Sequence, residues 1–222
     1  MLLSVKSGDV DTYPEYARSE RIADGTMHAL GVAGALIGAG LLVSLMFNAT
    51  PAQMAGLAIY AAALIGTFAA SAFYHMTPWE HLRPVLRRFD HAAIYLKIAG
   101  TYTPLVVLIG TGFAYLVLGL VWVLAIAGIT RKLIFWRTPG RFDPLLYLAM
   151  GWMSLALVWG LVPVMPSVAM VLIGAGGALY TCGVVFYSWE SLKFSNAIWH
   201  GFVLVASACF FAAIVLGTSV SA

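Results

Sequence analysis

Two pairs of polar residues have the spacing of neighbours on a helix, and each pair includes a histidine at the end of an apolar run. Ser71 and His75 are four residues apart in "SAFYH", and Asn196 and His200 are four residues apart in "NAIWH". Residues i and i+4 of an α-helix lie on one face, one turn apart. Each pair can therefore present both of its side chains to a shared centre.

Neutral imidazoles together with a carboxylate are the ligands that Zn²⁺ prefers. A catalytic zinc usually has three protein ligands and an open position for water, whose pKa it lowers to about 7, and a nearby aspartate can accept the proton. His75 and His200 are the two strong ligand candidates. By spacing, the third ligand comes from Asn196, Asp90 or His28. The Asn196 amide oxygen is the poorest zinc ligand of these.

Each histidine also has a simpler interpretation. His75, Asp90 and His200 can form a buried hydrogen-bond network that holds the helices together. The other histidines, His28, His81 and His91, have the positions of interfacial or loop residues that contact water or a carbonyl. Polar groups at membrane depth cost a few kcal/mol unless they have partners, and they usually face the interior of a bundle. This cost favours a functional site formed by His75, Asp90 and His200.

The elements that position these residues are seven apolar windows of about 20 residues, which is long enough to cross a bilayer. Of the 222 residues, 62% are hydrophobic and 9% are charged, whereas soluble domains are about one quarter charged. The windows lack the alternation of barrel strands and are too long for them. We therefore predict an all-α seven-transmembrane helix bundle. Its predicted spans are about 27–47, 53–75, 89–109, 112–130, 144–164, 168–189 and 197–217.

The positive charges predict the orientation, because Lys and Arg near a membrane are retained in the cytoplasm. They lie before the first, third, fifth and seventh windows, whereas the alternate loops and the C-terminal tail carry no charge. The N-terminus is therefore predicted to be cytoplasmic and the C-terminus external, in the inner (plasma) membrane. We divide the chain into a tail (1–26) without the apolar core of a signal peptide, a transmembrane domain (27–217) and an external tail (218–222). The cytoplasmic cations are Lys6, Arg18, Arg21, Arg83, Arg87, Arg88, Arg131, Lys132, Arg137, Arg141 and Lys193.

Lys97 is the exception to this distribution, because it lies well inside the third window. It follows Asp90 by seven residues, two turns along the same face. A lysine at this depth needs a partner or must be neutral. One interpretation is a structural or snorkelling pair. The other is a cation that neutralises Asp90 or binds an anionic lipid group.

Several classes of function lack support in the sequence. The net charge of +3 reflects the distribution of cations across the membrane, and it does not indicate binding of nucleic acid. No Cys-x-x-Cys motif or phosphate-binding glycine loop occurs. Cys182 and Cys209 lie inside predicted spans, and we expect them to pack as small apolar groups. Gly176 and Gly177 are typical of a close helix contact rather than of a ligand-binding loop.

The motifs "ERIADGTMH", "SAFYH", "RRFDHAAIYLKIAGTYTP" and "AIWHGFVLVAS", in this order along seven spans, resemble the bacterial hemolysin III family. That family is related to the progestin and adipoQ receptors and more distantly to alkaline ceramidases. The resemblance implies a zinc ion near the cytoplasmic ends of the helices. It makes His75 and His200 ligands, with Ser71 and Asp90 as polar partners in catalysis around the metal-bound water.

The chain departs from the family pattern at three positions. Asn196 stands where the family has the first histidine of an H-x-x-x-H pair, Phe210 replaces a further histidine, and Asp24 replaces an asparagine. The loss of an imidazole should weaken zinc binding by several kcal/mol, more than changes around a ligand do. The alternatives are weak zinc binding, Asp90 or water as the missing ligand, or a polar network around Lys97 in place of the metal.

Three functions are compatible with these residues. The first is metal-dependent hydrolysis of a lipid amide, which the resemblance to ceramidases suggests and which requires a lipid-sized cavity open to the bilayer. The second is a non-enzymatic sensor or regulator of membrane lipid state or energetics. The third is pore formation, which the uniformly apolar spans support least. The expected partner is a membrane lipid, such as a sphingolipid-like or acyl-chain ligand, and the sequence predicts no oligomeric state.

Overall fold

The described part of the chain forms helices of the length and composition that the sequence predicts. A computed structural model describes residues 16–135, 143–189 and 191–221, and seven of its helical segments are long and apolar enough to cross a membrane. The elements are α1 (Arg18–Met46), α2 (Pro51–Met76), the short 3-10 helix η1 (Glu80–Leu82), α3 (Arg83–Ile109), α4 (Gly112–Leu133), α5 (Asp143–Trp152), the 3-10 segment η2 (Met153–Leu157), α6 (Val158–Leu161), α7 (Ser167–Tyr187) and α8 (Ser195–Ser221). The fifth span consists of α5, η2 and α6. The prediction of a seven-helix bundle is confirmed.

The helix ends follow from local sequence signals. Thr50 caps α2 because its side chain accepts a hydrogen bond from Gln53 N, while Gln53 Oε1 accepts one from Thr50 N. Between α3 and α4, Gly110 has φ of 68°, a left-handed conformation that glycine adopts without steric cost. Thr111 then caps α4 through a hydrogen bond from Ala114 N. These signals keep the connections between spans short.

Two elements begin or end at positions that the apolar windows do not indicate. The first helix begins at Arg18, so its polar first turns precede the window that starts at about 27. The fifth span changes from α-helix to 3-10 helix at Met153, and α6 ends at Leu161. Proline has no N–H to continue a helical ladder, and Pro163 lies two residues after this end, next to the C-cap residue Val162. The early start of α1 matters for the site described below.

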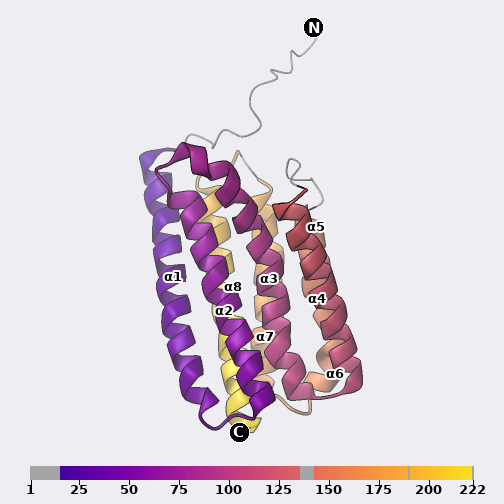
Figure 1. The fold of residues 1–222 in the computed structure, drawn as a ribbon. Helices are drawn as coiled ribbons and strands as arrows, with labels where there is room; N and C mark the ends of the chain where they lie inside the picture. The colour runs from indigo at the N-terminus through magenta and orange to yellow at the C-terminus, as the bar shows by residue number, and fades with distance from the viewer. Residues whose placement is uncertain (1–15, 136–142, 190, 222) are drawn as a thin grey trace.

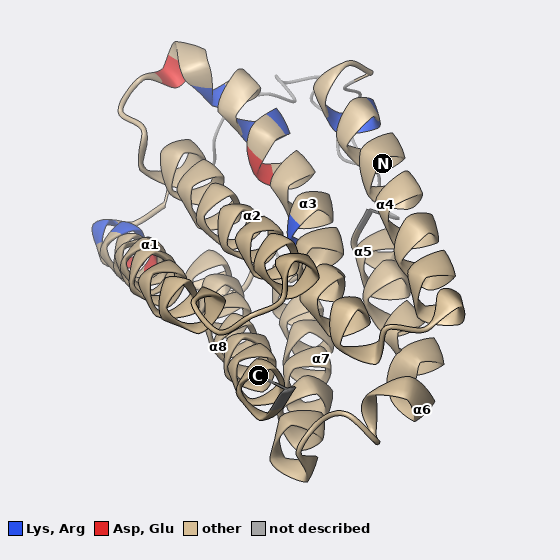
Figure 2. Ribbon diagram, turned by 60° about the horizontal axis from the view of Figure 1, so that its bottom comes forward, with Lys and Arg blue, Asp and Glu red and all other residues tan. Residues whose placement is uncertain are grey.

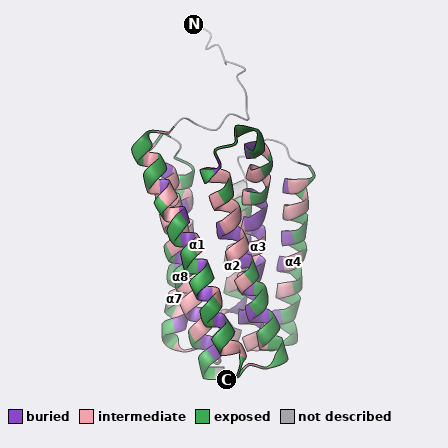
Figure 3. Cartoon of the chain, turned by 60° about the vertical axis from the view of Figure 1, so that its left-hand side comes forward, coloured by how far each residue is buried: buried purple, intermediate pink, exposed green. Residues whose placement is uncertain are grey.

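The third helix lies at the centre of the bundle. It packs against α2, α4 and α8, and also against α5 and α6, and its span is buried over a larger share of its length than any other. Figure 1 shows α1, α2 and α8 side by side at one flank of the bundle, with α4 and α5 at the other. Buried positions follow the inward sides of the helices, and exposed apolar positions face outward, as expected for helices in lipid (Figure 3).

Charged residues of the described chain gather toward one end of the bundle, around the start of α1 and the α2–α3 connection (Figure 2). This is the distribution that the positive-inside rule requires at a single membrane face. The cytoplasmic assignment of that end stays a prediction. Of the cations used for it, Lys6, Arg137 and Arg141 lie outside the described residues, as do residues 1–15 of the predicted tail and residue 222.

Close helix contacts depend on glycine at several positions. A Cβ atom on Gly176 would lie 2.7 Å from the Phe210 ring, so Gly176 forms a packing notch between α7 and α8, as predicted. Gly128 of α4 is similar, because a Cβ there would lie 2.5 Å from the ring of Tyr95. Tyr95 is buried and packs edge-on against Tyr147 at 4.8 Å between ring centroids.

Replacing Gly128 with alanine should therefore destabilise the bundle. The added methyl group overlaps a fixed ring, and overpacking of this kind costs roughly 1–3 kcal/mol. Gly119→Ala, in the same helix but with nothing within 4 Å of the new Cβ, is the matched control and should leave stability unchanged or slightly raised. Thermal unfolding in detergent measures both, and equal melting temperatures for the two variants would contradict this packing.

Candidate metal centre

Four ionisable side chains from three helices meet near the end of the bundle where α1 and α8 begin and α2 ends. Asp24 and His28 come from α1, His75 from the last turn of α2, and His200 from the second turn of α8. One ligand atom from each residue lies within 4.8 Å of the others. We call these four residues the metal cluster.

The carboxylate of Asp24 lies at the centre of the cluster. Its Oδ1 is 2.6 Å from His200 Nδ1, and its Oδ2 is 3.2 Å from His75 Nδ1 and 3.5 Å from His28 Nε2. The three imidazole rings surround it, with centroids 4.3 to 4.9 Å apart. No side chain of the cluster is more than 12% exposed, so the cluster is largely screened from bulk water.

This donor set fits a zinc ion. Three imidazole nitrogens and one carboxylate oxygen are among its preferred ligands, and the single negative charge offsets half of the charge of the ion. Among the described residues the buried His28 Nε2 makes no hydrogen bond beyond its 3.5 Å ion-pair contact with Asp24 Oδ2, so this nitrogen faces the centre and is available to an ion. In a tetrahedral site with bonds of about 2.0–2.1 Å, neighbouring ligand atoms are about 3.3 Å apart. The side chains therefore need only a modest contraction to close around an ion.

The first turns of α1 bring two of the four groups into the cluster. Asp24 and His28 are four residues apart and so lie on one helical face. Glu20, one turn earlier, joins the start of α1 to the start of α8. Its Oε2 accepts a hydrogen bond from Ala17 N, and its Oε1 accepts one from Phe194 N at 2.8 Å. Phe194 has φ of 64°, a conformation that this contact helps to hold.

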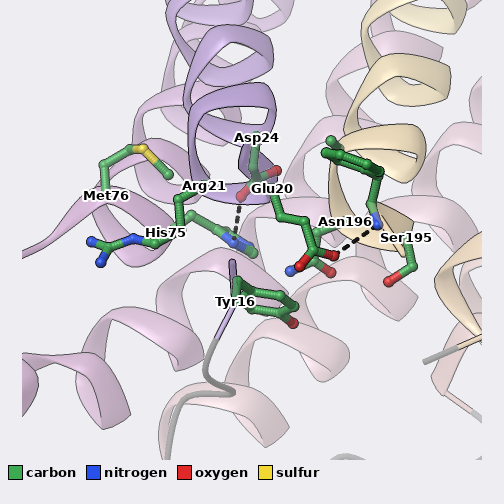
Figure 4. A pocket seen from close by; sticks show the side chains of 10 residues that line it. Tyr16, Glu20, Arg21, Asp24, His75, Met76, Ser195 and Asn196 are labelled. Carbon is green, nitrogen blue, oxygen red and sulfur yellow. Dashed lines mark hydrogen bonds and ion pairs between the residues drawn. The ribbon is translucent and has the colours of Figure 1, made fainter. Parts of the chain in front are cut away.

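A pocket leads from the end of the bundle to the cluster (Figure 4). Its lining includes Asp24 and His75 at the cluster, and Asn196 projects into it from the first turn of α8. The remaining lining residues are Tyr16, Glu20, Arg21, Met76, Phe194, Ser195 and Ala197. The pocket gives a small polar group a path to the buried carboxylate.

Comparison with known proteins agrees with this architecture. Residues 17–211 match the model of a family described as "Haemolysin-III related". The chain belongs to the haemolysin III family. The match runs from the start of α1 into α8 and so includes every residue of the metal cluster. Together with the seven apolar helices, family membership makes this a multi-pass membrane protein.

Relatives of this haemolysin III family member occur in bacteria and mammals. Hemolysin-3 of Bacillus cereus is 33% identical over 197 residues, covering 86% of this chain and 89% of the relative. A hemolysin-3 homolog of Bacillus subtilis is 34% identical over 196 residues, covering 86% and 91%. The human monocyte to macrophage differentiation factor is 30% identical over 202 residues, covering 88% and 83%.

The structure brings together some of the predicted site residues and leaves others outside the cluster. His75 and His200 meet as predicted, and His28 joins them as the third imidazole. Asn196 lines the pocket together with Asp24 and His75. Ser71 and Asp90 are half-buried, and the Asp90 carboxylate is not one of the four converging ionisable groups. Their catalytic roles stay predictions.

The sequence interpretation missed Asp24 as a member of the site and gave His28 no preference over the other candidates. Asp24 lies in the segment assigned to the tail (1–26), and His28 lies at the start of the first apolar window. The signal was present in the spacing, because Glu20, Asp24 and His28 recur every four residues. A polar stripe with helical period directly before an apolar span indicates that the helix begins earlier.

Replacing Asn196 with histidine should strengthen metal binding. Asn196 precedes His200 by one turn and lines the same pocket as Asp24 and His75, so an imidazole there adds a better donor beside the cluster. We expect the zinc Kd to fall by about tenfold or more in a chelator competition assay. Ala197→His, a pocket-lining change one residue further along α8, is the matched control. An unchanged Kd for Asn196→His would show that this side chain does not reach the ion.

Proposed function

We propose that this haemolysin III family member is a zinc-dependent hydrolase of a lipid amide. The observation that carries the proposal is the convergence of three imidazoles and one carboxylate, buried at one end of a membrane bundle and connected to its surface by a pocket. The donor set suits zinc, and the pocket gives water access to the donors. The resemblance to alkaline ceramidases supports the reaction class.

In this proposal His28, His75 and His200 hold the metal, and Asp24 handles the proton. A zinc ion with an open coordination position supplies a Lewis acid for a carbonyl group and lowers the pKa of water to about 7. In this structure Asp24 lies within hydrogen-bonding or ion-pair distance of all three imidazoles. If those nitrogens bound zinc instead, the Asp24 carboxylate would be free to accept a proton from water. Water then adds to the amide carbon, the carbon–nitrogen bond breaks, and the amine leaves with a proton.

The pocket limits which part of a lipid can enter. Its enclosed space is only about 10 Å³, roughly the room that one water molecule needs. That space admits water but no lipid head group, so binding of a substrate would require the helix ends around the pocket to move apart. The chains of the substrate are therefore proposed to lie against the lipid-facing sides of α1, α2 or α8. The charge distribution supports placing the pocket on the cytoplasmic side, and the plasma membrane is the proposed location.

The test is release of fatty acid by the purified, zinc-loaded protein in vesicles that contain an N-acyl sphingoid lipid. We expect turnover that stops on chelation and returns with zinc. The same assay with a matched ester-linked lipid, and with a lipid that has no carbonyl at the head group, shows whether cleavage is specific for amides. Absence of fatty-acid release from every lipid amide tested, by a protein that carries stoichiometric zinc, would contradict the hydrolase.

The number of donors favours a second candidate, a non-enzymatic regulator or sensor of membrane lipid state. Four protein ligands saturate a tetrahedral zinc ion, as they do in structural sites. If Asp24 binds the ion directly, the metal joins α1, α2 and α8 without leaving an open position. The Asp24→Asn variant in the Discussion separates these two functions.

A further inference from the structure

Lys97 is buried in the interior of the bundle, and within the described chain no carboxylate forms an ion pair with it. The residue is 8% exposed. Its Nζ donates a hydrogen bond to Ser207 Oγ at 2.5 Å and lies over the rings of Phe68 and Tyr180, at 4.7 and 5.4 Å from their centroids. The Tyr180 hydroxyl is 3.0 Å from the same Ser207 Oγ. The surroundings of Lys97 are therefore hydroxyl groups and aromatic faces, not Asp90.

These surroundings stabilise a positive charge. Aromatic faces attract an ammonium group through the ring quadrupole, and the attraction grows when water is excluded. The Ser207 hydroxyl donates its own proton to the carbonyl of Val203, so its oxygen is free to accept from the ammonium. A hydroxyl group and two rings thus take the place of the water that the ammonium loses on burial.

Two helices place this ammonium directly beneath the metal cluster. Ser207 follows His200 by seven residues on α8, and Phe68 precedes His75 by seven residues on α2. Seven residues are two helical turns, so each contact of Lys97 shares a face with a cluster histidine at an axial separation of about 10 Å. The space between includes apolar groups such as Phe68 and Val203, which screen charges far less than water does.

We propose that Lys97 is a fixed positive charge that weakens the affinity of the metal cluster for a divalent cation. The inference rests on the proposed metal site. In the metal-free protein the ammonium is attracted to the Asp24 carboxylate, whereas a bound divalent ion reverses the sign of the cluster and is repelled. For charges about 10 Å apart and an effective dielectric constant of about 20, Coulomb's law gives a change in Kd on the order of a hundredfold.

The experiment measures zinc and cobalt Kd by chelator competition on the full-length protein in detergent. Lys97→Met removes the charge and keeps the length of the side chain, and Lys97→Gln is a second neutral variant in case the first does not fold. Lys97→Arg keeps the charge. Lys132→Met is the matched control, because Lys132 is also a buried lysine, at 2% exposure, but lies on α4, which contributes no residue to the cluster.

We expect both neutral variants to bind zinc roughly tenfold to a hundredfold more tightly, with the same factor for cobalt, while the arginine and Lys132 variants stay near the wild type. An equal factor for two metals is the signature of charge, because a change in ligand geometry affects different metals unequally. Neutral variants within about threefold of the wild type, or an arginine variant that tightens as much, would overturn the role of Lys97 and leave the metal site standing. A wild-type protein that binds no metal would overturn both.

Discussion

Replacing His75 with alanine is expected to abolish stoichiometric zinc binding. His75 supplies one of three imidazoles, and its Nδ1 faces Asp24 at 3.2 Å from the end of α2. Its loss removes the contribution of α2 to the metal cluster. Mutation of a residue that hydrogen-bonds a metal ligand typically reduces metal affinity by 10–100-fold. Loss of the ligand itself should therefore raise the zinc Kd by more, roughly a thousandfold. Metal analysis of protein purified without chelator, followed by competition titration, measures the effect.

The matched control is His81→Ala. His81 lies in η1, outside the metal cluster, and is exposed, so its removal changes the histidine content without touching the cluster. We expect this variant to keep the zinc content of the wild type. Equal zinc content in the His75 and His81 variants would mean that zinc binds elsewhere, and the proposed centre would be wrong.

Replacing Asp24 with asparagine is expected to separate metal binding from turnover. The change keeps the shape of the side chain and removes the charge that accepts a proton. In the hydrolase, three imidazoles continue to hold zinc, so the Kd should rise by no more than about tenfold. Proton transfer by a positioned group contributes typically 10²–10⁴-fold to a rate, and fatty-acid release at saturating zinc should fall by that factor.

The opposite pattern would identify a structural metal. If Asp24 is a direct fourth ligand, the asparagine variant should lose zinc together with the histidine variants. Stability should fall at the same time, because a metal that binds the folded protein stabilises it by an amount that grows with the logarithm of its affinity. Parallel loss of zinc and of thermal stability, with no lipid amide hydrolysed by the wild type, would favour the regulator.

The spans were predictable from sequence because the bilayer imposes a simple requirement of length and apolarity on every helix. The start of α1 was not predictable in this way, because the part of a helix that extends beyond the bilayer need not be apolar. Its first turns carry Glu20 and Asp24 among charged neighbours, and hydropathy alone excludes such a segment. The change to a 3-10 helix at Met153–Leu157 also could not be predicted from the apolar composition of that span.

The candidate site was predictable to the extent that single helices determine it. His75 and His200 lie at helix ends that apolar windows define, so their depth could be inferred. The neighbours of each helix could not be inferred in the same way, because the arrangement in which helices pack depends on the whole bundle. Thus Asp24 of α1, and not Asp90 of α3, meets the histidines. Lys97 likewise contacts Ser207, which lies 110 residues later in the chain.

The position of a bound ion is the sharpest check on the metal centre. A crystal structure of the zinc-loaded protein, with an anomalous difference map at the zinc absorption edge, should give one strong peak between α1, α2 and α8. The account predicts imidazole nitrogens of His28, His75 and His200 at about 2.0–2.1 Å from that peak. A map without a peak there, or a peak bound by fewer than two of these histidines, would contradict it.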